Sequence, residues 1–241
     1  MRRMRVFLAT GAALILLFSS ACSDKLSRQA GLTDAELFSR GQKFSDQKRY
    51  KAASEAFQNL LERFPTSPLA SRAQFGLASS RMANKDEIEA EVAFDDFLRL
   101  YPADPKVPDA LFMKGNLLSR QVLPPGKDQV KTRDAIKTYT LFLERDPGSP
   151  RAQEASGKIR ELRNRLALHG AAVVNHFLSR KLFDSAEARA RRAAAAYPDV
   201  PASPMLLSLL AQALEKQGKR DEAATVMKTI TEKYPEWGKK R

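Results

Sequence analysis

The stretch GQKFSDQKRYKAASEAFQNLLERFP, residues 41–65, decides the fold class of this 241-residue chain. Its apolar and small residues recur three or four positions apart, which is the spacing of one face of a helix. Beyond residue 32 the same spacing continues, and no segment alternates apolar and polar residues over the length of a strand. The sequence therefore predicts an all-α fold.

The residue-proline ending of that stretch is repeated along the chain. Amphipathic runs close at Phe64-Pro65, Tyr101-Pro102, Asp146-Pro147, Tyr197-Pro198 and Tyr234-Pro235, with prolines 37, 45, 51 and 37 residues apart. These spacings exceed the tetratricopeptide period of about 34 residues, which indicates repeats with insertions. The tetratricopeptide signature positions of the first run hold Gly41, Phe44, Tyr50, Ala53, Phe57 and Pro65. We expect an α-solenoid of about five tetratricopeptide-like helix pairs, in which small residues let helices approach and aromatic rings fill the space between them.

The turns between repeats carry capping signals. A capping side chain directly precedes proline at Ser67-Pro68, Asp104-Pro105, Ser149-Pro150 and Ser203-Pro204. We expect each to be a helix N-cap followed by proline at the first helical position, where its missing N–H costs nothing. Gly218 is expected to end the first helix of the last repeat.

Two segments depart from a plain array. Residues 121–131, which contain Pro124-Pro125-Gly126, lengthen the turn inside the third repeat into a loop. Helical periodicity runs through residues 150–181 and predicts one long junction helix, bent near Gly170. The sequence thus divides into N-terminal repeats 1–3 (32–149), this helix, and C-terminal repeats 4–5 (182–241).

The amino terminus has the layout of an exported protein. Three arginines in residues 1–5 precede an apolar run of thirteen residues and then small residues before Cys22. This predicts a signal peptide at 1–21, because the apolar run is too short to span a bilayer. A lone cysteine at the cleavage point resembles a bacterial lipobox, in which that cysteine is acylated and begins the mature chain. The alternative is a chance thiol beside an ordinary signal-peptidase site.

If Cys22 is the lipidated residue, residues 22–31 form a polar tether to the folded part. Several acyl groups on one residue meet the requirement that stable anchoring takes more than one chain. Ser23, where an aspartate would mark inner-membrane retention, resembles the outer-membrane pattern. Removal of residues 1–21 lowers the net charge from +13 to +10, because three arginines leave with them.

The composition excludes several function classes. One cysteine cannot form a disulfide scaffold or a cysteine-rich zinc module. His169 and His176 lie seven residues apart with no acidic or cysteine companion at metal-binding spacing, so a surface or partly buried pair is the simpler interpretation. The chain has no G-x-G-x-x-G, Walker A or G-x-S-x-G pattern. We therefore expect no enzyme activity, no cofactor and no metal site.

The strong positive charge has two interpretations. A net charge of +13 is compatible with binding nucleic acid, but the export signal takes the chain out of the cytoplasm, so we expect no nucleic-acid partner. Arg189, Arg191 and Arg192 form a local basic cluster. Such a cluster is either a solvated helix face or a surface that attracts anionic lipid or an acidic protein partner.

A lipobox followed by five repeats, with an interrupted third repeat and a long junction helix, resembles the BamD (ComL) family of outer membrane protein assembly lipoproteins. The stretches that carry the likeness are ASRAQFGLA (70–78), FLRLYP (97–102) and LRNRLALH (162–169). The likeness spans about residues 22–235. The chain departs from the family at Gly170, where an acid is common, and at residues 175–177, where the family has a tyrosine-rich segment.

The resemblance implies a non-catalytic, lipid-anchored scaffold of the β-barrel assembly (BAM) complex at the outer membrane, facing the periplasm. Its implied partners are a BamA-like insertase, held mainly by the C-terminal half, other BAM lipoproteins, and unfolded outer-membrane β-barrel proteins received by the N-terminal repeats. Arg189 stands where the family carries an arginine implicated in the BamA contact, and Arg192 joins it as a partner-binding candidate. The alternative is an exposed arginine in a basic helix.

A second class of scaffold stays open. A periplasmic adaptor of the CpoB/Tol–Pal type, which coordinates envelope constriction with peptidoglycan synthesis, fits the first two repeats nearly as well. Such chains normally lack the lipobox and carry an amino-terminal coiled coil, and neither feature matches here. An enzyme such as a murein hydrolase with helical repeats lacks any candidate active site.

Overall fold

The computed structural model describes residues 31–237, which form ten α-helices and contain no strand. In chain order they are α2 (Asp34–Asp46), α3 (Tyr50–Arg63), α4 (Ala70–Ala83), α5 (Glu87–Leu100), α6 (Val107–Arg120), α7 (Val130–Arg145), α8 (Ala152–Ser179), α9 (Phe183–Ala196), α10 (Ser203–Lys216) and α11 (Arg220–Lys233). The all-α prediction is confirmed. The expected signal peptide (1–21), Cys22 and the tether up to residue 30 lie outside the described residues.

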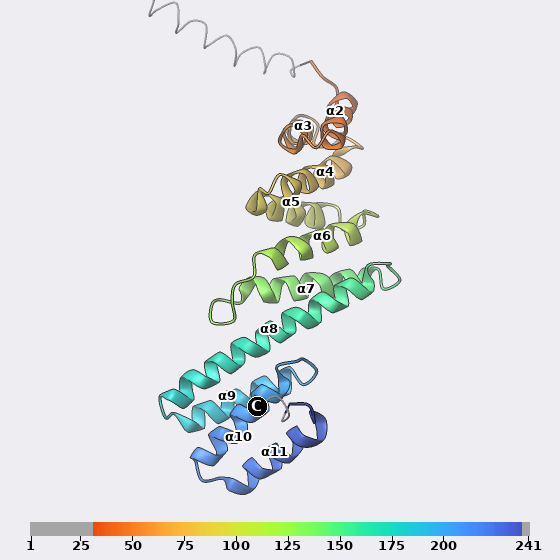
Figure 1. Cartoon of the computed structure of the whole chain (residues 1–241). Helices are drawn as coiled ribbons and strands as arrows, with labels where there is room; N and C mark the ends of the chain where they lie inside the picture. The colour runs from red at the N-terminus through yellow and green to blue at the C-terminus, as the bar shows by residue number, and fades with distance from the viewer. Residues whose placement is uncertain (1–30, 238–241) are drawn as a thin grey trace, which may run out of the picture. The chain divides into compact units, whose positions relative to one another are not determined.

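The helices form five consecutive pairs, from α2/α3 to α10/α11, and the predicted α-solenoid of helix pairs is confirmed. The chain divides into two compact units, one ending at Ala93 and the other beginning at Phe94, inside α5. In the first unit α2, α3 and α4 contact one another in order, and in the second each helix from α6 to α11 contacts the next (Figure 1). The division into 32–149, 150–181 and 182–241 stays a prediction.

In the first unit, the buried ring of Phe57 on α3 lies between two glycines of neighbouring helices. A Cβ atom added at Gly41 of α2 would lie 2.6 Å from Phe57 Cε1, and one at Gly76 of α4 would lie 2.8 Å from Cε2. Real side chains do not approach so closely, so only glycine admits the ring at both places. This is the combination of small residues and an aromatic ring that the sequence pattern predicts. In the second unit Gly115 and Tyr139 repeat it, at 2.6 Å.

Alanine stands twelve residues before each of the five repeat prolines, and every one of these alanines is buried. They are Ala53, Ala90, Ala135, Ala186 and Ala223. The position that holds the aromatic residue Phe57 in the first repeat is filled less regularly in the others. Met227, which corresponds to Phe57 in the last repeat, is 45% exposed. The reason is that no helix follows α11 within the described residues to cover it, as α4 covers Phe57.

Three of the predicted capping residues cap a turn that precedes the helix, and not the helix itself. α4 begins at Ala70, three residues after Ser67, and not at Pro68. The hydroxyl of Ser67 accepts a hydrogen bond from the Leu69 N–H at 3.0 Å, and its carbonyl accepts the Ala70 N–H at 2.9 Å. Asp104 and Ser149 accept the N–H two residues ahead in the same way, at 2.7 and 3.4 Å. The proline therefore belongs to a separate turn that leads into each helix.

At the fourth site the predicted cap is wrong. Ser203 is the first residue of α10, and Ala202 is its N-cap. The Ser203 hydroxyl donates to the carbonyl oxygen of Val200 at 2.5 Å or of Tyr197 at 2.7 Å, and so closes the preceding turn.

Four of the five turns within the repeats share one closure. Gly218 ends α10 with φ +80°, as predicted, and the Lys219 N–H donates to the Leu214 carbonyl at 3.0 Å. This is a Schellman closure, which requires a left-handed residue after the helix. The equivalent positions in three other repeats hold lysine, with φ of 57° at Lys48, 67° at Lys85 and 58° at Lys181.

α8 is one unbroken helix of 28 residues that continues through Gly170. A Cβ atom added at Gly170 would lie 3.1 Å from the Cβ of Ala193 on α9. The glycine therefore serves a close approach between α8 and α9.

The loop that contains residues 121–129 is tied to α8. The Arg165 guanidinium donates to the Leu123 carbonyl at 2.9 Å, and His169 Nδ1 lies 2.6 Å from the Pro125 carbonyl oxygen. The Gln129 amide donates inside the loop to the carbonyls of Pro124 and Lys127, at 2.9 and 3.0 Å. The insertion is thus an ordered part of the second unit.

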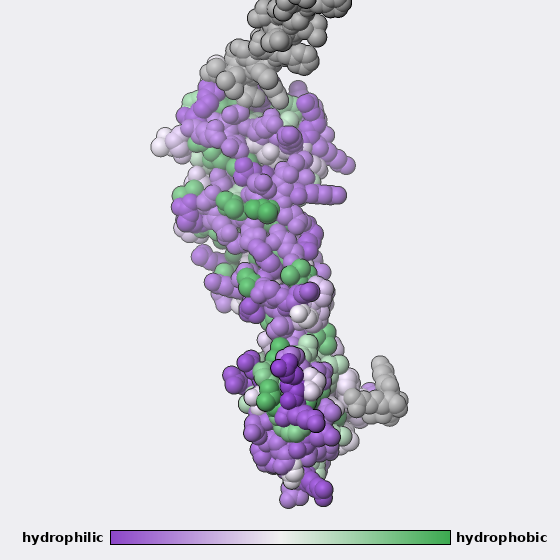
Figure 2. All heavy atoms as spheres, turned by 90° about the vertical axis from the view of Figure 1, so that its left-hand side faces the viewer, coloured by the Kyte–Doolittle hydropathy of each residue, from purple (hydrophilic) through white to green (hydrophobic). Residues whose placement is uncertain are grey.

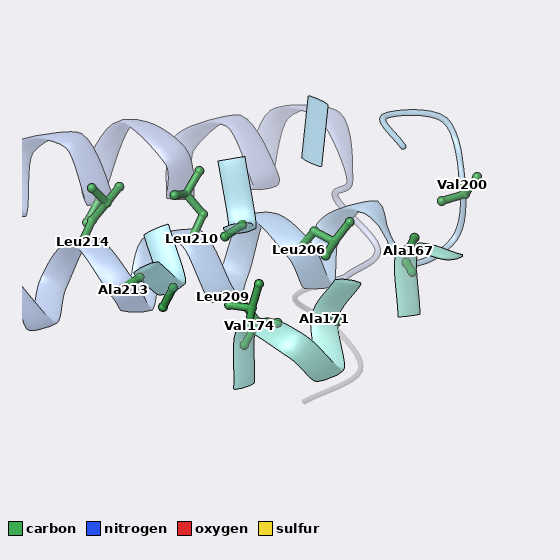
Figure 3. Close-up of a cluster of buried hydrophobic side chains, with 13 residues drawn as sticks. Ala167, Ala171, Val174, Val200, Leu206, Leu209, Leu210, Ala213 and Leu214 are labelled. Atoms are coloured by element: carbon green, nitrogen blue, oxygen red, sulfur yellow. The ribbon is translucent and has the colours of Figure 1, made fainter. Parts of the chain in front are cut away.

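The core of the second unit's carboxy-terminal part is made of small and branched aliphatic residues from α8 to α11. Figure 3 shows Val174 and Ala171 of α8 beside Leu209 and Leu206 of α10, with Leu210 pointing away from α8. This apolar cluster, which also includes Ala186 and Ala190 of α9, holds α9 in place.

Candidate partner-binding site

Helix α9 presents the two arginines that the sequence singled out. Ala186 and Ala190 face the core, so positions 189 and 192 lie on the outer side of the helix, where both arginines are exposed. Near them on α9 stand the exposed alanines Ala188, which precedes Arg189, and Ala195 and Ala196, which follow Arg192. We call this surface, Arg189 and Arg192 with these alanines, the α9 face.

Arg189 is oriented by an aromatic ring of the preceding helix. Its guanidinium lies 5.5 Å from the ring centroid of Phe177 on α8, which is a cation–π distance. Within residues 31–237, neither Arg189 nor Arg192 forms an ion pair. The two positive charges of the α9 face are therefore available to an external group.

Arg191 lies on the other side of α9, in an ion-pair network. Its Nε donates to Glu187 Oε1 at 2.8 Å and its Nη2 to Glu222 Oε2 of α11 at 2.6 Å. Lys219 Nζ donates to Glu187 Oε2 at 2.8 Å, and the Gln217 amide donates to the same oxygen at 2.9 Å. The structure thus separates Arg191 from Arg189 and Arg192, although the three are nearly adjacent in sequence.

These donors stabilise the ionised form of Glu187. The hydrogen bonds from Lys219 and then Arg191 lower the pKa of Glu187 from 4.5 to about 2. A carboxylate that accepts several charged hydrogen bonds stays ionised at neutral pH. The network therefore ties the first half of α9 to the turn between α10 and α11 at neutral pH.

The carboxy-terminal end of α9 is fixed from α8. Arg163 makes a bidentate pair with Asp199, with Nη1–Oδ2 3.0 Å and Nη2–Oδ1 2.8 Å, and also donates to the Ala196 carbonyl at 3.2 Å. α9 is thus held at both ends as well as along its buried side. A rigid helix that presents two exposed guanidinium groups loses little entropy when a partner binds.

The chemistry of the α9 face is anion recognition. A guanidinium presents planar donors that pair with both oxygens of a carboxylate, which a lysine ammonium does not reproduce. The alanines beside it allow another backbone to approach closely. The arrangement therefore suits a polypeptide segment that carries acidic side chains.

Sequence reasoning named Arg189 and Arg192 but missed the residues that position them. The place of Phe177 under Arg189 depends on a contact between two helices, which the sequence does not show. Arg163 and Asp199 lie 36 positions apart and carry no local signal. The charge pattern alone could have separated Arg191, because Glu187 stands four residues before it on the same side of the helix.

Residues 31–237 lack two further features. No group of three or more histidine, cysteine, aspartate or glutamate side chains lies close enough to hold a metal ion. None of the helices there combines the length and the apolar character needed to cross a membrane.

The fold and the α9 face define a class, that of helix-repeat proteins that present a rigid charged surface. Within that class, the sequence model of the family YfiO, described as "Outer membrane lipoprotein", matches residues 31–230. The chain belongs to this family of outer membrane lipoproteins.

Curated relatives carry one description. The outer membrane protein assembly factor BamD of Neisseria meningitidis serogroup A is 23% identical over 246 aligned positions, covering 96% of this chain and 92% of the relative. The BamD protein of Vibrio cholerae is 25% identical over 219 positions, covering 87% of this chain and 90% of the relative. Both likenesses extend over almost the whole of each protein.

Solved structures with similar helix arrangements include a tetratricopeptide repeat protein from Parabacteroides merdae, with a TM-score of 0.42, 14% identity, and coverage of 82% of this chain and 78% of that one. The thermophilic TPR protein TTC0263 from Thermus thermophilus has a TM-score of 0.41 and 17% identity, and covers 84% of this chain and 92% of that one.

Proposed function

We propose that this protein is a non-catalytic, lipid-anchored scaffold of the β-barrel assembly complex, which faces the periplasm and binds a BamA-like insertase through the α9 face. Membership of the outer membrane lipoprotein family and the likeness to BamD assembly factors support a role in outer membrane protein assembly. The observation that carries the binding step is the exposed Arg189, which forms no ion pair within residues 31–237, on a helix held at both ends.

The mechanism rests on binding alone. An acidic side chain of the insertase's periplasmic part would pair with the Arg189 guanidinium, with Arg192 adding a second positive charge. Phe177 limits the motion of the Arg189 guanidinium, so the pair forms with little loss of side-chain freedom. The N-terminal repeats would receive unfolded β-barrel substrates, and other lipoproteins of the complex would bind elsewhere.

The lipid anchor supplies the second part of the function. Acylation of Cys22 would keep the helix pairs at the inner face of the outer membrane and raise their effective concentration for membrane-bound partners.

The test is affinity purification from detergent-solubilised outer membrane, with quantification of the co-purified insertase. Arg189→Ala is expected to weaken the interaction about ten- to hundredfold in Kd, because a hydrogen bond to a charged group contributes about 1.5–3 kcal/mol. Arg189→Lys should restore only part of it, because lysine lacks the bidentate geometry.

The matched control is Arg133→Ala, which removes an exposed arginine from α7. It is expected to leave recovery of the insertase unchanged. Recovery of Tol–Pal proteins or peptidoglycan synthases in place of an insertase would contradict the proposal and favour a CpoB-type adaptor.

A further inference from the structure

The first half of α5, in the first unit, exposes aliphatic side chains that the repeat packing does not use. Ala90 and Ala93 face the core, whereas Ile88 and Val92 lie on the opposite side of the helix and are 77% and 54% exposed. They stand four residues apart and so form one continuous apolar ridge. Ile88 has the largest exposed fraction among the large hydrophobic side chains that the structure describes.

Acidic residues lie close to this ridge in the sequence. Asp86, Glu87, Glu89 and Glu91 fall within the same turn and a half, and residues 86–98 contain no lysine or arginine. Glu89, beside the ridge, is exposed. In a chain whose net charge is +13, this segment is a local reversal of sign. We call Ile88, Val92 and the four acidic residues the α5 ridge.

The negative charge of these acidic residues indicates which kind of partner the α5 ridge binds. A membrane that contains anionic lipid repels the α5 ridge, so the exposed aliphatic pair is not suited to insertion into such a surface. Figure 2 shows one side of the molecule, whose surface is largely hydrophilic with hydrophobic residues gathered in separate spots. A surface with an apolar centre and a charged rim is typical of a protein-binding site.

We propose that the α5 ridge binds a positively charged amphipathic segment of another polypeptide. The apolar side of that segment would cover Ile88 and Val92, and its lysine or arginine side chains would meet the acidic rim. The α9 face needs a partner of opposite charge, because its own groups are arginines. The two surfaces therefore bind different segments, and the α5 ridge does not depend on the function proposed for the α9 face.

The test uses a fluorescent synthetic peptide of leucine and lysine, with the leucines on one side of its helix, and fluorescence anisotropy with the purified full chain. A peptide of the same pattern with glutamate in place of lysine reports the charge requirement. The lysine peptide is expected to bind more weakly as salt is raised, and the glutamate peptide is expected not to bind the α5 ridge.

Three variants locate the binding. Ile88→Ser/Val92→Ser should raise the Kd for the lysine peptide about tenfold or more, because two aliphatic contacts are lost. Glu89→Lys should raise it several-fold. Leu141→Ser, which removes an aliphatic side chain of α7 that is 39% exposed, is the matched control and should leave the Kd unchanged. All these side chains are exposed, so the helical circular dichroism should be retained.

Equal binding of the lysine peptide by the wild type and the serine double variant would overturn the proposal. So would binding of anionic vesicles that depends on Ile88 and Val92, which would make the ridge a membrane contact. Self-association in sedimentation equilibrium that is lost in the double variant would assign the ridge to a second copy of this chain. A wild-type response with Arg189→Ala in the same assay separates this inference from the α9 face.

Discussion

The substitution Gly41→Ala tests the packing that joins the first repeats. Alanine is about 1 kcal/mol more favourable than glycine inside a helix, so the change stabilises a helix whose surroundings are open. At Gly41 the new Cβ would lie 2.6 Å from Phe57 Cε1. The ring has little room to move away, because it is buried and its other edge packs against Gly76, 2.8 Å from where a Cβ atom would lie.

Overpacking a filled core costs about 1–3 kcal/mol, and a rigid ring with glycine on both sides places the cost in the upper part of that range. After the gain in helix propensity, we expect Gly41→Ala to lose about 1–2 kcal/mol in the free energy of unfolding. The assay is urea unfolding followed by circular dichroism at a helical wavelength.

Gly157→Ala is the matched control, because Gly157 lies inside α8 with nothing within 4 Å of its Cβ position. It should gain about 0.5–1 kcal/mol. The replacement Phe57→Leu in the Gly41→Ala background should recover part of the loss that the collision causes. If Gly41→Ala were as stable as Gly157→Ala, the close-packing argument would be refuted.

Three other predictions concern a turn, a pH dependence and the anchor. Lys85→Gly relieves a left-handed lysine at φ 67° and should add about 0.5 kcal/mol to the free energy of unfolding, measured by urea titration; a loss would show that the backbone there is unstrained. The folded-state pKa of Glu187, about 2, is below its ordinary value of 4.5, so its ionised form contributes stability above about pH 4.5 that is lost as the pH falls toward 2. The difference in unfolding free energy between wild type and Glu187→Gln should therefore shrink between pH 5 and pH 2, and a difference independent of pH would remove the network from the account. Cys22→Ala should release the protein from outer-membrane fractions, as immunoblots of fractionated cells would show, and unchanged partition would contradict lipid anchoring.

The parts of the fold that could be predicted are those in which one position determines a contact. Glycine, alanine and an aromatic residue at fixed distances from a proline identify the helix pairs, because close helix packing tolerates few side chains there. Gly41 and Phe57 are the clearest case. Met227 stands at the position that corresponds to Phe57. Its exposure could not be predicted from that position, because it depends on whether a helix packs over α11.

The parts that could not be predicted depend on residues far apart in sequence or on unusual backbone. Lysine is not a signal for a left-handed turn, so Lys48, Lys85 and Lys181 give no warning of their conformation. The attachment of the 121–129 loop to α8 joins His169 to Pro125 across 44 positions.

The candidate site also has one part that could be predicted from the sequence and one part that could not. Arg189 and Arg192 could be named from the sequence, since charge and position in the repeat are local properties. Arg191 pairs with Glu187 and Glu222, whereas Arg189 and Arg192 form no ion pair within residues 31–237. This difference follows from the packing of α11 against α10 and from the Glu187 network. A list of basic residues alone does not distinguish a structural arginine from a binding one.

The most direct test of a role in outer membrane protein assembly is the amount of folded β-barrel protein in the outer membrane after this protein is depleted from its native cell. Folded barrels keep a distinct gel mobility until they are heated, so the folded fraction can be measured by electrophoresis. The account predicts that the folded fraction falls on depletion, that wild type restores it, and that Arg189→Ala restores it only in part. Unchanged folded barrels in depleted cells that fail to constrict their envelope would contradict it.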